Sequence, residues 1–96
     1  MTAISEPHAR ADVLNRLRRA EGQIRGIQRM VEAGEDCRKV GQQFAAVRKA
    51  LDSTYLRMTV CFIEQELSER LQPDEGQKAD LSHMLKDMES LLARIG

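Results

Sequence analysis

The chain has 96 residues, of which 42% are hydrophobic but only 3% are aromatic, and it contains no Trp. A chain of this length buries a modest core, so residues 1–96 are expected to form a single small domain. The formal net charge is zero, and no apolar run reaches the length of about 18 residues that a membrane span requires, so no membrane partner is expected.

The charge is unevenly distributed along the chain. Residues 1–50 contain ten Lys or Arg against six Asp or Glu, whereas residues 51–96 contain five against nine, so the halves carry +4 and −4. Such asymmetry indicates a basic face. The N-terminal residues lack the apolar segment of a signal peptide, and two cysteines without such a signal indicate a reducing compartment, which predicts a cytoplasmic protein.

The first predicted helix covers about residues 8–33, after a segment, residues 1–8, that is predicted to be disordered. Pro7 suits the first helical turn, and Gly34 suits the position just after the helix. Between them, apolar residues recur at spacings of three and four, which is typical of an amphipathic helix. They are Val13, Leu14, Leu17, Ala20, Ile24, Ile27, Met30 and Val31.

The second predicted helix covers residues 37–71, because Asp36 is a good N-cap and no proline occurs before Pro73. A helix of this length extends over about 50 Å, and two shorter neighbours cannot cover it. We therefore expect a second copy of the chain to pack against it. A third amphipathic helix is predicted over residues 75–95. With no strand alternation in the sequence, the fold class is all-α, as three helices in an oligomeric bundle.

The two cysteines raise the question of a shared site. Cys37 and Cys61 lie about 36 Å apart along a continuous helix, so they cannot meet within one chain. An antiparallel partner would bring Cys37 to the distal half of its second helix. At 100° per residue, Glu66 lies within roughly 20° of the Cys37 direction, whereas Cys61 lies about 120° away. Cys61 also has the alternative of being a buried structural thiol.

Cys37 is the stronger candidate for reactivity. It starts a helix and precedes Arg38 and Lys39, and both features favour the thiolate, which is the form that attacks electrophiles and binds metals. The alternative is an inert residue at a helix start. No HxH, CxxC or HExxH spacing, phosphate-binding glycine loop or Ser/His/Asp set occurs, so the protein is not expected to be an enzyme.

Residues 16–37, RLRRAEGQIRGIQRMVEAGEDC, together with QQFAAVRKAL at 42–51, resemble the CsoR/RcnR/FrmR family of metal- or thiol-responsive bacterial repressors. The resemblance implies a disc-shaped tetramer of two antiparallel dimers. It also implies binding of double-stranded operator DNA through basic faces of the first two helices, and release when an effector engages Cys37. The basic residues in question are Arg16, Arg18, Arg19, Arg25, Arg38, Lys39, Arg48 and Lys49.

The chain departs from the family pattern at the positions that set effector specificity. Copper sensors of this kind have His 25 residues after the cysteine and a second Cys 29 residues after it, where this chain has Phe62 and Glu66. The predicted effector residues are therefore Cys37, Cys61 and Glu66. Three alternatives stay open: a Cu(I) or other soft-metal sensor, a persulfide- or formaldehyde-type thiol sensor without metal, and a helical scaffold that binds no DNA.

Overall fold

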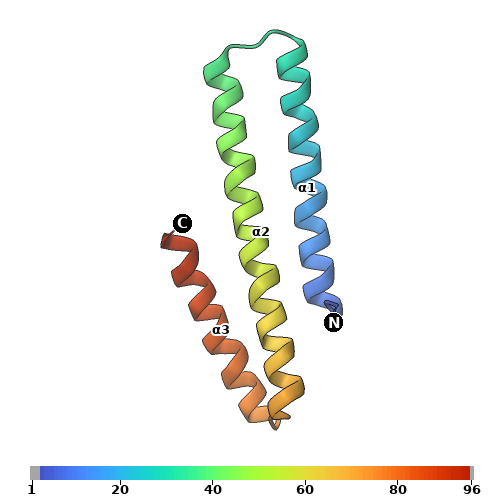
Figure 1. Cartoon of the computed structure of the whole chain (residues 1–96), viewed down its shortest axis with the longest axis vertical. Helices are drawn as coiled ribbons and strands as arrows, with labels where there is room; N and C mark the ends of the chain where they lie inside the picture. The colour runs from blue at the N-terminus through green and yellow to red at the C-terminus, as the bar shows by residue number, and fades with distance from the viewer. Residues whose placement is uncertain (1–2, 96) are drawn as a thin grey trace.

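A computed structural model describes residues 3–95 as three α-helices, with no strand among them (Figure 1). The predicted all-α fold class and the number of helices are therefore confirmed. Helix α1 spans Pro7–Glu32. The Glu6 side chain caps its start by accepting hydrogen bonds from the backbone N–H groups of His8 and Ala9, at 3.1 and 2.6 Å. Gly34, with φ of 71°, follows its end and turns the chain toward α2.

Helix α2 spans Cys37–Leu71 and is the longest element, with 35 residues. The Asp36 carboxylate caps it by accepting from the Arg38 N–H at 2.8 Å. It ends where Gln72 adopts a left-handed conformation, directly before Pro73, which cannot continue a helix. Helix α3 spans Glu75–Ile95. No helix among the described residues has the length and apolar character needed to cross a membrane.

The segment before α1 differs from the predicted disorder of residues 1–8. Residues 1 and 2 lie outside the described part of the chain, and Pro7 already belongs to α1. The Gln65 side chain on α2 holds the segment, because its amide accepts from the Ser5 N–H at 3.1 Å and donates to the Ala3 carbonyl at 2.7 Å. This pairing spans about 60 residues of sequence, so no local pattern indicates it.

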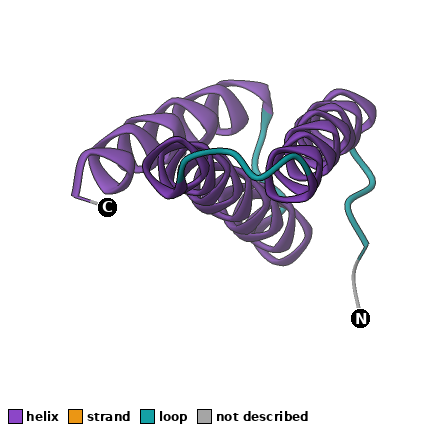
Figure 2. Cartoon of the chain, turned by 90° about the horizontal axis from the view of Figure 1, so that it is seen from above, coloured by secondary structure: helices purple, strands orange, loops and turns teal. Residues whose placement is uncertain are grey.

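Helix α2 lies between the other two helices (Figures 1 and 2). Helix α1 runs antiparallel beside it, whereas α3 follows only its C-terminal part. In the described residues, α1 and α3 have no Cα atoms within 8 Å of each other. The chain is consequently elongated, at 57 × 25 × 19 Å. The N-terminal half of α2 is covered by α1 alone.

The core of the chain is small. Its buried apolar residues are Ala9, Val13, Ala20 and Ile27 of α1, Val47, Val60 and Cys61 of α2, and Leu85 of α3. In contrast, one face of α2 exposes large apolar side chains at spacings of seven, four, three and four residues. We call this face the apolar stripe; it consists of Phe44, Leu51, Tyr55, Met58 and Phe62. Such spacing is typical of a helix that packs against another helix.

Candidate functional site

Cys37 is the first residue of α2, where its free thiol is exposed. The neighbouring Arg38 and Lys39 are exposed as well. The placement follows from local sequence, because Asp36 supplies the cap that starts the helix at this point. A thiol in this position is accessible to a metal ion or an electrophile, and the effector role of Cys37 stays a prediction.

Glu66 lies near the other end of the same helix and is half-buried. Its Oε2 accepts from Arg70 Nε at 3.2 Å, one turn further on. Twenty-nine residues separate Glu66 from Cys37, which corresponds to about 44 Å of helix. Within one chain, therefore, the two residues do not form a common site. The described residues contain no group of three His, Cys, Asp or Glu side chains that could hold a metal ion.

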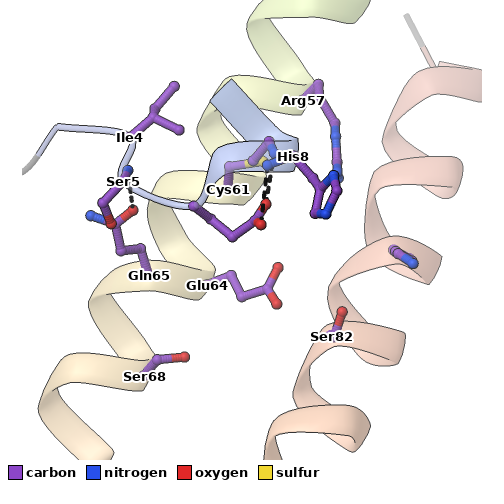
Figure 3. A pocket seen from close by; sticks show the side chains of 12 residues that line it. Ile4, Ser5, His8, Arg57, Cys61, Glu64, Gln65, Ser68 and Ser82 are labelled. Atoms are coloured by element: carbon purple, nitrogen blue, oxygen red, sulfur yellow. Dashed lines mark hydrogen bonds between the residues drawn. The ribbon is translucent and has the colours of Figure 1, made fainter. Parts of the chain in front are cut away.

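Cys61 occupies a different side of α2 from the apolar stripe. It is 8% exposed, whereas the adjacent Phe62 is 47% exposed. Cys61 lines a pocket of about 480 Å³ between the N-terminal segment, α2 and α3. Figure 3 shows Cys61, Arg57 and His8 close together in this pocket, with Ser82 of α3 across from them.

The electrostatic surroundings of Cys61 keep its thiol neutral. Burial raises the pKa of Cys61, and the nearby Arg57 guanidinium opposes that rise only in part. The carboxylates of Glu64, Glu89 and Asp12 raise it further. A protonated thiol is a poor nucleophile and a poor metal ligand. These properties are those of a packed core cysteine.

The eight predicted DNA-binding residues lie on α1 and α2, and all are exposed except Arg16, which is half-buried. Several have acidic or polar neighbours on their own helix. Arg18 donates to Asn15 Oδ1 at 3.3 Å, and Arg25 pairs with Glu21. Pairs of this kind at spacings of three and four residues hold the side chains along the helix surface.

A polar groove of about 410 Å³ runs between α1 and α2, and we call it the basic groove. The residues that line it are Asp12, Asn15, Arg16, Arg19, Ala20 and Gln23 of α1 and Ala50, Ser53 and Thr54 of α2. Arg16 donates to Asp12 Oδ1 at 3.2 Å and to Ser53 Oγ at 3.4 Å. The guanidinium groups and the Ser53 hydroxyl suit phosphate oxygens.

A second groove also lies between α1 and α2, on the side of the helical hairpin opposite the basic groove. Its lining is mainly apolar and includes Ile24, Ile27, Phe44, Val47 and Leu51, around a volume of about 420 Å³. Arg48, one of the eight predicted DNA-binding residues, lines this groove and not the basic groove. Phe44 and Leu51 belong to the apolar stripe. The helical hairpin of α1 and α2 thus has the basic groove, with Arg16 and Arg19, on one side and a mainly apolar groove, with Arg48 and Asp52 in its lining, on the other.

The structure also identifies charged residues that the sequence analysis missed. Arg57 of α2 donates to Asp12 of α1 through Nε at 3.2 Å and to Glu89 of α3 through a terminal nitrogen at 3.4 Å. The only sequence signal for Asp12 is its position four residues before Arg16. Arg57 falls between the buried Thr54 and Val60, one turn on either side, and a charge at such a position indicates a partner on a neighbouring helix.

Comparison with known proteins gives a consistent result. The family described as metal-sensitive transcriptional repressor matches residues 9–94. The copper-sensing transcriptional repressor CsoR of Bacillus subtilis is 33% identical over 67 residues, which cover 70% of this chain and 66% of that protein. The copper-sensing transcriptional repressor RicR of Mycobacterium tuberculosis is 51% identical over 43 residues, which cover 45% of each chain. No solved structure matches significantly.

Proposed function

This chain belongs to the metal-sensitive transcriptional repressor family, and we propose that it binds operator DNA through basic residues of α1 and α2 and is released when an effector engages Cys37. The family consists of regulators of transcription rather than enzymes, in agreement with the sequence analysis. The resemblance inferred from residues 16–51 is thereby confirmed. Family membership does not specify the DNA contacts, the assembly or the effector of this chain, and we propose each of these below.

The observation that carries the DNA-binding proposal is the division of the α1–α2 hairpin into two faces. The basic groove presents Arg16 and Arg19 beside the hydroxyl of Ser53, whereas the groove on the opposite side is mainly apolar, with Arg48 among its lining residues. Duplex DNA displays phosphates at regular intervals, and Arg side chains that neutralise them release counterions. One face can therefore bind the DNA backbone while the other packs against a second chain.

The apolar stripe supports an antiparallel dimer. It runs from Phe44 to Phe62, so its midpoint is residue 53. Two stripes that pair antiparallel about this midpoint place residue i opposite residue 106 − i, and Cys37 then lies opposite position 69 of the partner chain. Position 69 is within one helical turn of the partner's Glu66. Pairing of the stripes thus brings Cys37 and Glu66 of different chains together, twice per dimer. Two such dimers form the proposed tetramer.

The donor atoms at this shared site do not match a complete Cu(I) site. Cys37 supplies a thiolate and Glu66 a carboxylate, but Phe62, which stands on the same face, has no donor atom. Cu(I) prefers thiolate and imidazole ligands. The chemistry on which the proposal rests is therefore that of the exposed Cys37 thiol, which either reacts with a persulfide or aldehyde or contributes to soft-metal binding with a further ligand. Participation of Cys61 requires that its side chain leave its buried position in the pocket between the N-terminal segment, α2 and α3.

The DNA-binding proposal is tested with the promoter fragment of the protein's own gene, labelled for fluorescence anisotropy. We expect affinity to fall steeply between about 50 and 200 mM salt, since about 0.9 counterion is released for each phosphate contact. Arg19→Gln should weaken binding and lower the salt slope by about one for each chain that contacts the DNA. Arg94→Gln, at the far end of α3, is the matched control and should change neither. A scaffold without DNA binding would show no salt-dependent complex.

The effector proposal is tested on the preformed complex with DNA. Cu(I), an inorganic polysulfide and formaldehyde are added separately, and the release of DNA is compared with the mass of the intact protein. Cys37→Ala should abolish both the response and the mass change. Cys61→Ala should respond as the wild type does if Cys61 is only a core residue, and should lose the response if both thiols are needed.

A further inference from the structure

A chain of ion pairs connects all three helices to the basic groove. Glu89 of α3 accepts from Arg57 of α2 at 3.4 Å, and Arg57 donates to Asp12 Oδ2 of α1 at 3.2 Å. The other oxygen of the same carboxylate, Oδ1, accepts from Arg16 Nε at 3.2 Å. Arg16 reaches Ser53 through its terminal nitrogen at 3.4 Å. Asp12 is therefore shared between two guanidinium groups.

Asp12 and Arg57 have different access to the groove. Asp12 lines it together with Arg16 and Arg19, and it is the groove's one carboxylate in the described residues. Arg57 does not line it. The Arg57 side chain is 22% exposed and instead faces the pocket that contains Cys61. A phosphate in the groove can thus meet Asp12 and Arg16 but not Arg57.

The carboxylate of Asp12 opposes phosphate binding in two ways. It repels the phosphate, and it occupies Nε of Arg16, an N–H that the phosphate would otherwise accept from. The cation of Arg57 counteracts both effects, because it offsets the charge of Asp12 from the protected side and takes up one of its oxygens. Burial alone would lower the pKa of Arg57, but attraction from the Glu89 carboxylate and hydrogen bonds to Glu89 and Asp12 raise it, so Arg57 stays a cation.

We propose that Arg57 is a positioning residue for DNA binding: by holding Asp12, it leaves Arg16 able to bind a backbone phosphate. The inference rests on the proposed DNA-binding function. Without Arg57, Asp12 pairs with Arg16 alone, and the groove loses most of one positive charge. The carboxylate acts as an internal competitor of the phosphate, and Arg57 sets how strongly it competes.

The test compares wild type, Arg57→Gln, Asp12→Asn and the double variant by anisotropy with the promoter fragment over a range of salt concentrations. Arg57→Gln should weaken binding about threefold per contacting chain, hence about tenfold for a dimer, which is within the range of exposed ion pairs. Its salt slope should also fall. The double variant should regain at least wild-type affinity, because the competing carboxylate is gone. Asp12→Asn alone should bind at least as tightly as wild type.

A purely structural role for Arg57 predicts different results. If the only role of Arg57 is to hold the helices together, the additional loss of Asp12 cannot restore the contacts that Arg57→Gln removes. The double variant should then bind DNA as weakly as Arg57→Gln, or more weakly. Failure of the rescue, or unchanged binding by Arg57→Gln, overturns the inference. If Arg57→Gln does not fold, as judged by circular dichroism, Asp12→Asn decides alone, since weaker binding than wild type overturns the inference. Absence of DNA binding by the wild type overturns the proposed function itself.

Discussion

Removing one aromatic ring from the apolar stripe should weaken dimerisation strongly. Phe62 leaves 47% of its surface exposed in the single chain. With about 200 Å² for a whole Phe, this is about 95 Å², worth about 2 kcal/mol at about 25 cal/mol per Å² when a partner covers it. A twofold interface contains the side chain twice, so Phe62→Ala should cost about 4 kcal/mol, or roughly a thousandfold in the dissociation constant.

Sedimentation equilibrium over nanomolar to micromolar concentrations measures this constant directly. Leu71→Ala is the matched control, because Leu71 belongs to the same helix and is 69% exposed. It lies nine residues from Phe62 and hence about 180° around the helix. We expect this control to dimerise as wild type does. The reasoning is refuted if the wild type is a folded monomer at micromolar concentration, or if both variants weaken the dimer equally.

Two further predictions concern ionisable side chains. At pH 8, iodoacetamide should modify Cys37 well before Cys61 in the folded protein, because burial raises the pKa of Cys61, and peptide mass spectrometry should show equal labelling only after denaturation. Glu6 has a pKa below its ordinary value of 4.5, since its carboxylate accepts from the Ala9 and His8 N–H groups. The charged Glu6 cap therefore contributes to the stability of the fold above pH 4.5, and this contribution is lost as the pH falls through the lowered pKa of Glu6. Glu6→Gln should therefore lower the melting temperature at pH 7 but leave it unchanged near pH 2, and an equal decrease at both would contradict the charged cap.

The helices were predictable because their signals are local. Asp36 and Pro73 bound the second helix within a few residues of its ends, and the spacing of apolar residues reports helical periodicity directly. The contacts between helices were not predictable in this way. Gln65 pairs with Ala3, and Arg57 pairs with Asp12 across 45 residues. Each partner is one of many polar residues in the sequence, and only the packing of the helices selects it.

For the cysteines as well, the sequence predicts the local helix geometry but not the packing between helices. Helical phase alone separates Cys61 from the direction of Cys37 by about 120°. Phase does not say which direction faces another helix of the same chain. The structure supplies this, because Cys61 is buried beside His8 and Ala9 at the start of α1, whereas Phe62 is exposed (Figure 3). The role of Cys61 in effector binding stays a prediction, whereas its burial is a property of the fold.

The exchange Phe62→His should turn the proposed shared site into a better Cu(I) site. Position 62 lies on the same face of the helix as Cys37 and one turn before Glu66. The variant adds an imidazole, a ligand that Cu(I) prefers, to a site that otherwise offers one thiolate and one carboxylate.

Competition with a chromogenic Cu(I) chelator, at protein concentrations that keep the variant dimeric, should show tighter binding than wild type. Ile63→His is the control, because it adds the same imidazole about 100° around the helix and should gain nothing. Combination with Cys37→Ala should abolish the gain. If the wild type already binds Cu(I) as tightly as Phe62→His does, the missing ligand comes from elsewhere, and the buried Cys61 thiol would have to reach the site.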